Sequence, residues 1–88
     1  MLFRSRLEYE LTLENILVAL YKNINIQPLI SYLKNGLMSI SVIKEQTINQ
    51  IVNIGIQANN LFLWQANTLL ERQSNETIAE IFNILSNQ

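Results

Sequence analysis

Residues 41–72 read SVIKEQTINQIVNIGIQANNLFLWQANTLLER and contain the longest helical pattern in the chain. Apolar residues recur in and beside this stretch at steps of three and four, the spacing of one face of an α-helix. The members of this series are Ile40, Ile43, Ile48, Ile51, Ala58, Phe62 and Leu69. We therefore predict one long helix over residues 41–72.

Two positions could interrupt this helix. Gly55 lies in its middle, where glycine costs roughly 1 kcal/mol relative to alanine. The pair Asn59–Asn60 is a second weak point, since asparagine favours turns. A break near either position is the alternative to a continuous helix.

A first helix is predicted over residues 5–22. Ser5 and Glu8 have the spacing of a capping box, in which the serine oxygen accepts from a backbone N–H and the glutamate reaches back. Apolar residues at helical spacing follow this signal. They are Leu7, Leu11, Leu13, Ile16, Leu17 and Leu20.

Two shorter helices are predicted on either side of residues 41–72. Pro28 suits the first turn of a helix and Asn35-Gly36 can supply the left-handed residue that ends one, which predicts a helix over 28–35. Ser74 is a good N-cap for a last helix over 75–86. The last helix has a single apolar stripe, made of Ile78, Ile81, Phe82 and Leu85.

These elements predict an all-α fold, a small bundle of three to four helices. The 88 residues contain no internal repeat and no linker, so we expect a single helical domain over 1–88. A chain of this length has a thin stability margin, because it buries only roughly 60–65% of its unfolded surface.

The chain carries little charge for its size. Charged residues make up 15% of the sequence, against about 25% in average soluble domains. Residues 46–70 contain none at all. Interface cores are depleted in charge, and small chains often gain stability by association. We therefore favour burial in an assembly over a surface solvated only by amides.

Most catalytic and metal-binding chemistry is excluded by composition. The sequence has no Cys, no His and no Asp, so zinc sites, thiol nucleophiles and Ser-His-Asp triads cannot form. Glu8, Glu10 and Glu14 are close in sequence but are expected to face solvent. We expect no catalytic residues, no metal and no cofactor, and hence a protein that is not an enzyme.

An uncharged amide face is predicted on the long helix. If residues 41–72 form one straight helix, most of its amide side chains and Trp64 share one side. Tryptophan among amides is typical of a recognition surface. The predicted partner-binding residues are Gln50, Asn53, Gln57, Asn60, Trp64 and Asn67. Alternatively, a kink at Asn59–Asn60 would turn Trp64 into the core.

The leading functional hypothesis is a protein–protein interaction module, namely an adaptor, an assembly or export chaperone, an inhibitor or a self-assembling subunit. Its partner would be a second copy or a different protein. The alternative is a helix-turn-helix DNA-binding regulator, with residues 28–35 followed by a second helix. It ranks lower because DNA binding needs cations, whereas the net charge is −1 and Glu45 cancels Lys44.

A membrane location is not expected. Residues 46–70 are long enough to span a bilayer, but they include five Asn and four Gln, which are costly in hydrocarbon. Arg4 and Arg6 precede acidic residues that interrupt any signal-peptide core. We therefore expect no transmembrane segment and a cytoplasmic location.

Overall fold

The computed structural model describes the backbone of residues 2–88 and the side chains of residues 11–88. These residues form helices only, with no strand among them. The all-α prediction is confirmed, but the predicted three to four helices are wrong. The five helices are α1 (Leu2–Asn23), α2 (Gln27–Lys34), α3 (Ile40–Ala58), α4 (Leu61–Glu71) and α5 (Asn75–Ser86).

The extra helix comes from a break in residues 41–72. The continuous helix predicted there is wrong, and the alternative break at Asn59–Asn60 is correct. Asn59 adopts a left-handed conformation with φ of 50°, which asparagine tolerates better than most residues because its side chain bonds locally. The Asn60 N–H donates back to the Gly55 carbonyl at 3.2 Å. The other weak point, Gly55, lies inside α3 without ending it.

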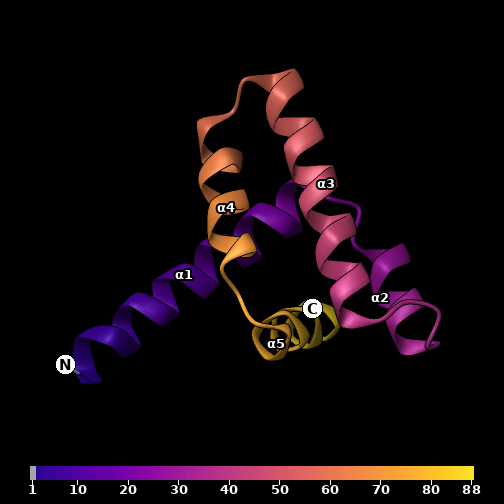
Figure 1. Cartoon of the computed structure of the whole chain (residues 1–88), viewed down its shortest axis with the longest axis horizontal. Coiled ribbons are helices and arrows are strands. Elements are labelled where there is room, and N and C mark those ends of the chain that lie inside the picture. Colours follow the sequence, from indigo (N-terminus) through magenta and orange to yellow (C-terminus); the bar gives the residue numbers. More distant parts are fainter. Residues whose placement is uncertain (1) are drawn as a thin grey trace.

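Asn60 starts the next helix immediately. Its Oδ1 accepts a hydrogen bond from the backbone N–H of Leu63 at 3.3 Å, which is an N-cap. Because one asparagine ends α3 and the next begins α4, the chain reverses within two residues. α4 then runs back beside α3 as an antiparallel helical hairpin (Figure 1).

α1 is longer than predicted. It begins at Leu2, so Ser5 lies inside the helix and the predicted start at residue 5 is wrong. The Ser5 and Glu8 side chains of the expected capping box lie outside the described side chains. The N-terminal part of α1 extends away from the other helices (Figure 1). Its C-terminal part buries Ile16, Ala19 and Leu20.

α2 ends where the sequence indicates. Pro28 lies in its first turn, and Gly36 takes the left-handed conformation with φ of 70°. The N–H of Gly36 donates to Leu33 O at 3.2 Å and that of Leu37 to Tyr32 O at 2.8 Å. This pair of bonds is a Schellman motif, which explains why glycine stands there.

α5 has the bounds predicted from its sequence. It lies against α2 and the N-terminal end of α3 (Figure 1). The Ser74 Oγ accepts from the Thr77 N–H at 3.3 Å and caps the helix. Every member of its apolar stripe is at most 2% exposed. The buried apolar core combines this stripe with residues of the other four helices, including Leu20, Ile43 and Leu70.

Candidate functional site

The predicted binding residues on α3 lie on its outer side. Asn53 and Gln57 are exposed and Gln50 is half-buried. The Gln57 Nε2 donates to Asn53 Oδ1 at 3.4 Å, a long bond between exposed groups. These three amides therefore stay available for hydrogen bonds to another molecule.

The predicted residues on α4 have different environments. The Asn60 side chain is used as the N-cap of α4. Asn67 is only 8% exposed and faces the interior, and its Oδ1 has no hydrogen-bond partner within the described part of the chain. An unpaired buried carbonyl costs about 1–3 kcal/mol. The six predicted residues therefore do not form one stripe, because the stripe required a straight helix.

Trp64 lies across the hairpin, against α3. A Cβ built on Gly55 would be 3.6 Å from both Cε2 and Nε1 of the indole. The ring thus lies against the α3 backbone at Gly55 and leaves room for a Cβ at an ordinary contact distance. Trp64 keeps 37% of its surface exposed. It is therefore neither fully outward, as a straight helix would make it, nor fully buried, as the kink alternative expected.

The α3–α4 connection also exposes apolar residues that the predicted amide face does not include. Ile56 is 63% exposed, Leu61 71% and Phe62 40%. With Trp64, they lie within about one helical turn of Asn59–Asn60. We call Ile56, Leu61, Phe62 and Trp64 the hairpin tip. The run of four apolar residues at 61–64 directly after two turn-forming asparagines was the signal that could have identified it.

Charge is confined to the opposite end of the hairpin. The uncharged residues 46–70 include the whole tip. At the base, the Lys44 Nζ donates to the carbonyl oxygens of Glu71 at 3.1 Å and Gln73 at 2.6 Å. Glu71 is the last residue of α4 and Gln73 follows its C-cap, so the ammonium lies at the C-terminal end of α4, where a cation is electrostatically favourable. Lys44 therefore ties α3 to the α4–α5 connection, while the tip stays free of charge.

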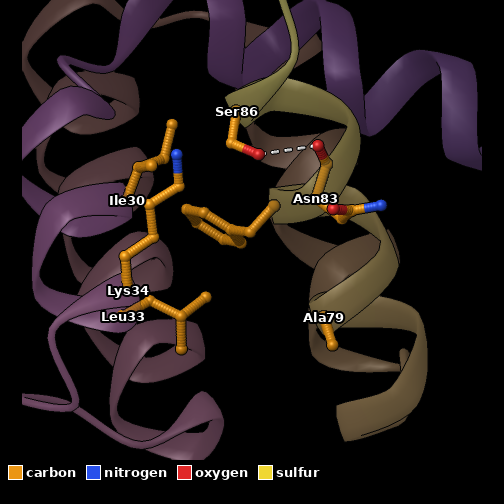
Figure 2. A pocket seen from close by; sticks show the side chains of 7 residues that line it. Ile30, Leu33, Lys34, Ala79, Asn83 and Ser86 are labelled. Carbon is orange, nitrogen blue, oxygen red and sulfur yellow. Dashed lines mark hydrogen bonds between the residues drawn. The ribbon is translucent and has the colours of Figure 1, made fainter.

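Two cavities in the described part of the chain lie elsewhere and are small. The larger of these two, about 240 Å³, lies between α2 and α5, and its lining includes Phe82, Ile30 and Ala79 (Figure 2). Ser86 Oγ and the Asn83 carbonyl at its rim bond to each other at 2.8 Å. A second hollow of about 150 Å³ lies beside Tyr21 on α1. Both are smaller than the roughly 300–1,000 Å³ of typical small-molecule sites.

Neither a group of metal-ligating side chains nor a membrane-spanning helix is found among the described residues. The described residues contain no group of three or more His, Cys, Asp or Glu placed to hold a metal ion. Within the same part of the chain, no helix has the length and apolar character needed to cross a bilayer. The hairpin tip holds four of the ten large apolar residues that are exposed in the described part of the chain.

No protein family model, no curated protein and no solved structure matches this chain. The candidate site is thus defined by the chain's own residues. It consists of the hairpin tip and the neighbouring amides Gln50, Asn53 and Gln57 on α3.

Proposed function

We propose that this chain is a non-enzymatic protein–protein interaction module that binds another chain through the hairpin tip. One observation carries the proposal: four large apolar side chains are exposed together around the α3–α4 connection, in a segment without charge. Adaptors, assembly or export chaperones, inhibitors and self-assembling subunits all share this requirement, since each acts by binding alone.

The amount of apolar surface supports this function. At their exposed fractions, the four tip side chains present roughly 400–500 Å². Contiguous apolar patches of about 300–600 Å² are the largest on typical monomers and are often functional. Aromatic residues are enriched and charges are depleted in the centre of protein interfaces. The tip has both properties, with Phe62 and Trp64 as its aromatic residues.

We assign the amides on the outer side of α3 to the polar edge of the same interface. Gln50, Asn53 and Gln57 retain accessible donors and acceptors, which suits the polar edge of an interface. Asn60 and Asn67 are assigned structural positions instead, one as a helix cap and one inside the bundle. The proposed binding residues are therefore the four tip residues with Gln50, Asn53 and Gln57.

DNA binding is less well supported. α2, the connection and α3 do follow one another in helix-turn-helix order. However, Lys44 is the only cation of α3, and its Nζ already donates to two carbonyl oxygens of the chain. A recognition helix without a free cation lacks the phosphate contacts that provide most of the affinity for DNA.

Site-specific photocrosslinking tests the proposal. A benzophenone side chain replaces Leu61 in the tip or, as a matched control, Leu37 in the α2–α3 connection, because the two residues are 71% and 69% exposed. In host cells, we expect discrete protein adducts from position 61 and few from position 37. Absence of adducts at position 61, or equal adducts at both positions, would contradict a specific binding surface at the tip.

A further inference from the structure

We infer that the partner of the hairpin tip is a second copy of this chain, which forms a two-fold symmetric dimer with the two tips in contact. This inference rests on the proposed function, since it names the partner of the same surface. It follows from the absence of charge at the tip, from the chemistry of the amides around it, and from the area that two tips would bury.

A two-fold interface brings the same patch of both subunits together, so the patch as a whole must be complementary to itself, and groups close to the axis meet their own copy. A charged side chain near such an axis meets a like charge and is repelled. Residues 46–70 contain no charge, and the net charge of the whole chain is only −1. Two tips can therefore approach without electrostatic repulsion.

Amides and apolar groups are complementary to themselves. An Asn or Gln side chain carries both a donor and an acceptor, so two copies can bond to each other. Asn53 and Gln57 are exposed and share only a long bond of 3.4 Å, which they can exchange for bonds across the axis. The same amides can therefore serve on both sides of a homodimer.

The area predicts how strong the dimer is. Two tips that cover each other would bury roughly 800–1,000 Å² of apolar surface in total. With the amides of α3 included, the buried area approaches about 1,200 Å², the smallest area typical of stable interfaces. Interfaces of this size are weak or transient. We expect a dissociation constant for the dimer on the order of 10–100 µM.

Sedimentation velocity tests this at protein concentrations from roughly 1 µM to 1 mM, a range that extends below and above the expected dissociation constant. We expect the mass of the unmodified chain to rise from one to two chains. Trp64 is the single tryptophan, so its emission should shift to the blue with the same midpoint. Leu61→Gln should raise the protein concentration at which half of the chains are dimeric by at least tenfold. The control Leu37→Gln, at nearly equal exposure, should leave it unchanged.

A second matched pair guards against loss of folding in one variant. Ile56 in the tip and Tyr21 on α1 are both 63% exposed. Ile56→Gln should weaken the dimer as Leu61→Gln does, and Tyr21→Gln should not, with unchanged circular dichroism in each variant used. Equal effects of tip and control variants would overturn the inference, because the tip would not be the contact surface.

The remaining outcomes separate this inference from the proposed function. A mass of one chain up to 1 mM overturns the dimer. If crosslinks from position 61 then still reach a different protein, the interaction module stands with a heterologous partner. If the single chain instead binds vesicles of phosphatidylcholine and phosphatidylglycerol with a blue shift of Trp64, both are overturned in favour of a lipid surface.

Discussion

α5 and the hairpin tip are both rich in apolar residues, but they place them differently. Ile78, Ile81 and Phe82 of α5 are at most 1% exposed. In the tip, Leu61 is 71% and Phe62 40% exposed. The two regions lie at opposite ends of the α3–α4 hairpin (Figure 1). The same residue types therefore stabilise the fold at one end and remain uncovered at the other.

The difference shows that the apolar pattern does not by itself distinguish core from interface. The stripe of α5 meets three other helices. The tip projects where the chain reverses, and its residues stay between 37% and 71% exposed although Trp64 lies against Gly55. Apolar side chains contribute to folding in proportion to the area that they remove from water. Substitutions in the two regions should therefore change the free energy of unfolding by different amounts, because the side chains are buried to different extents.

Two phenylalanines give the largest expected difference. Phe82→Ala should lower the free energy of unfolding by about 3–5 kcal/mol, because it opens a cavity in the core. Phe62→Ala removes a side chain that is 40% exposed and should cost about 1 kcal/mol. Urea denaturation at a concentration where the chain is monomeric measures both. Similar losses would mean that the tip is part of the core.

Removal of the Lys44 ammonium, which bonds to two carbonyl oxygens at the end of α4 and beyond it, should have the next largest effect on the free energy of unfolding. Lys44→Met removes two hydrogen bonds to carbonyl oxygens near α5 and should destabilise the chain by about 1–2 kcal/mol. The matched control is Lys34→Met, since Lys34 is exposed in the last turn of α2; its effect should stay within about 0.5 kcal/mol. Equal effects would indicate that Lys44 does not tie α3 to the α4–α5 connection.

The reversal itself can be tested at Asn59. Asn59→Ala should destabilise by about 1 kcal/mol, because alanine tolerates the left-handed conformation poorly. Asn59→Gly should be neutral or slightly stabilising, since glycine adopts that conformation readily. Thermal unfolding followed by circular dichroism gives the sign. Greater stability and more helix in the alanine variant would support the continuous helix over 41–72 instead of a hairpin.

The smallest effect is expected where Trp64 meets α3. Gly55→Ala should stabilise by up to about 1 kcal/mol, because alanine is the better helix former and its Cβ would meet Trp64 and Leu63 at ordinary contact distances of 3.6–3.7 Å. Gly36→Ala should act in the opposite direction, by about 1 kcal/mol, since its φ is 70°. Chemical denaturation compares the two. Destabilisation by Gly55→Ala would show that the ring needs the bare backbone.

Much of the fold was predictable because its signals are local. The ends of α2 and the cap of α5 depend on Gly36 and Ser74, each of which acts on backbone groups a few residues away. The break between α3 and α4 was harder, since Asn59 and Asn60 are compatible with both a helix interior and a reversal. Packing of α4 against α3 favours the reversal, and a single-sequence pattern does not include that energy.

The candidate site was predictable only in part. The prediction that Asn53 and Gln57 point outward from α3 is confirmed, because helical periodicity places side chains correctly within one straight helix. Beyond Asn59 the helix axis reverses, so the angles assigned to Asn60, Trp64 and Asn67 no longer refer to the same face. Leu61 and Phe62 were assigned to no binding surface for the same reason.

The amino-acid composition alone shows the lack of charge over residues 46–70. Backbone chemistry and residue periodicity are sufficient for the all-helical class and for the caps and stops of the shorter helices, because these depend on groups within about one helical turn of each other. Packing of distant segments was needed to fold α4 back on α3, to lay Trp64 on Gly55 and to leave Leu61 uncovered. Exposure is a property of what lies next to a side chain in space, and the neighbours of the tip are set by where the chain reverses.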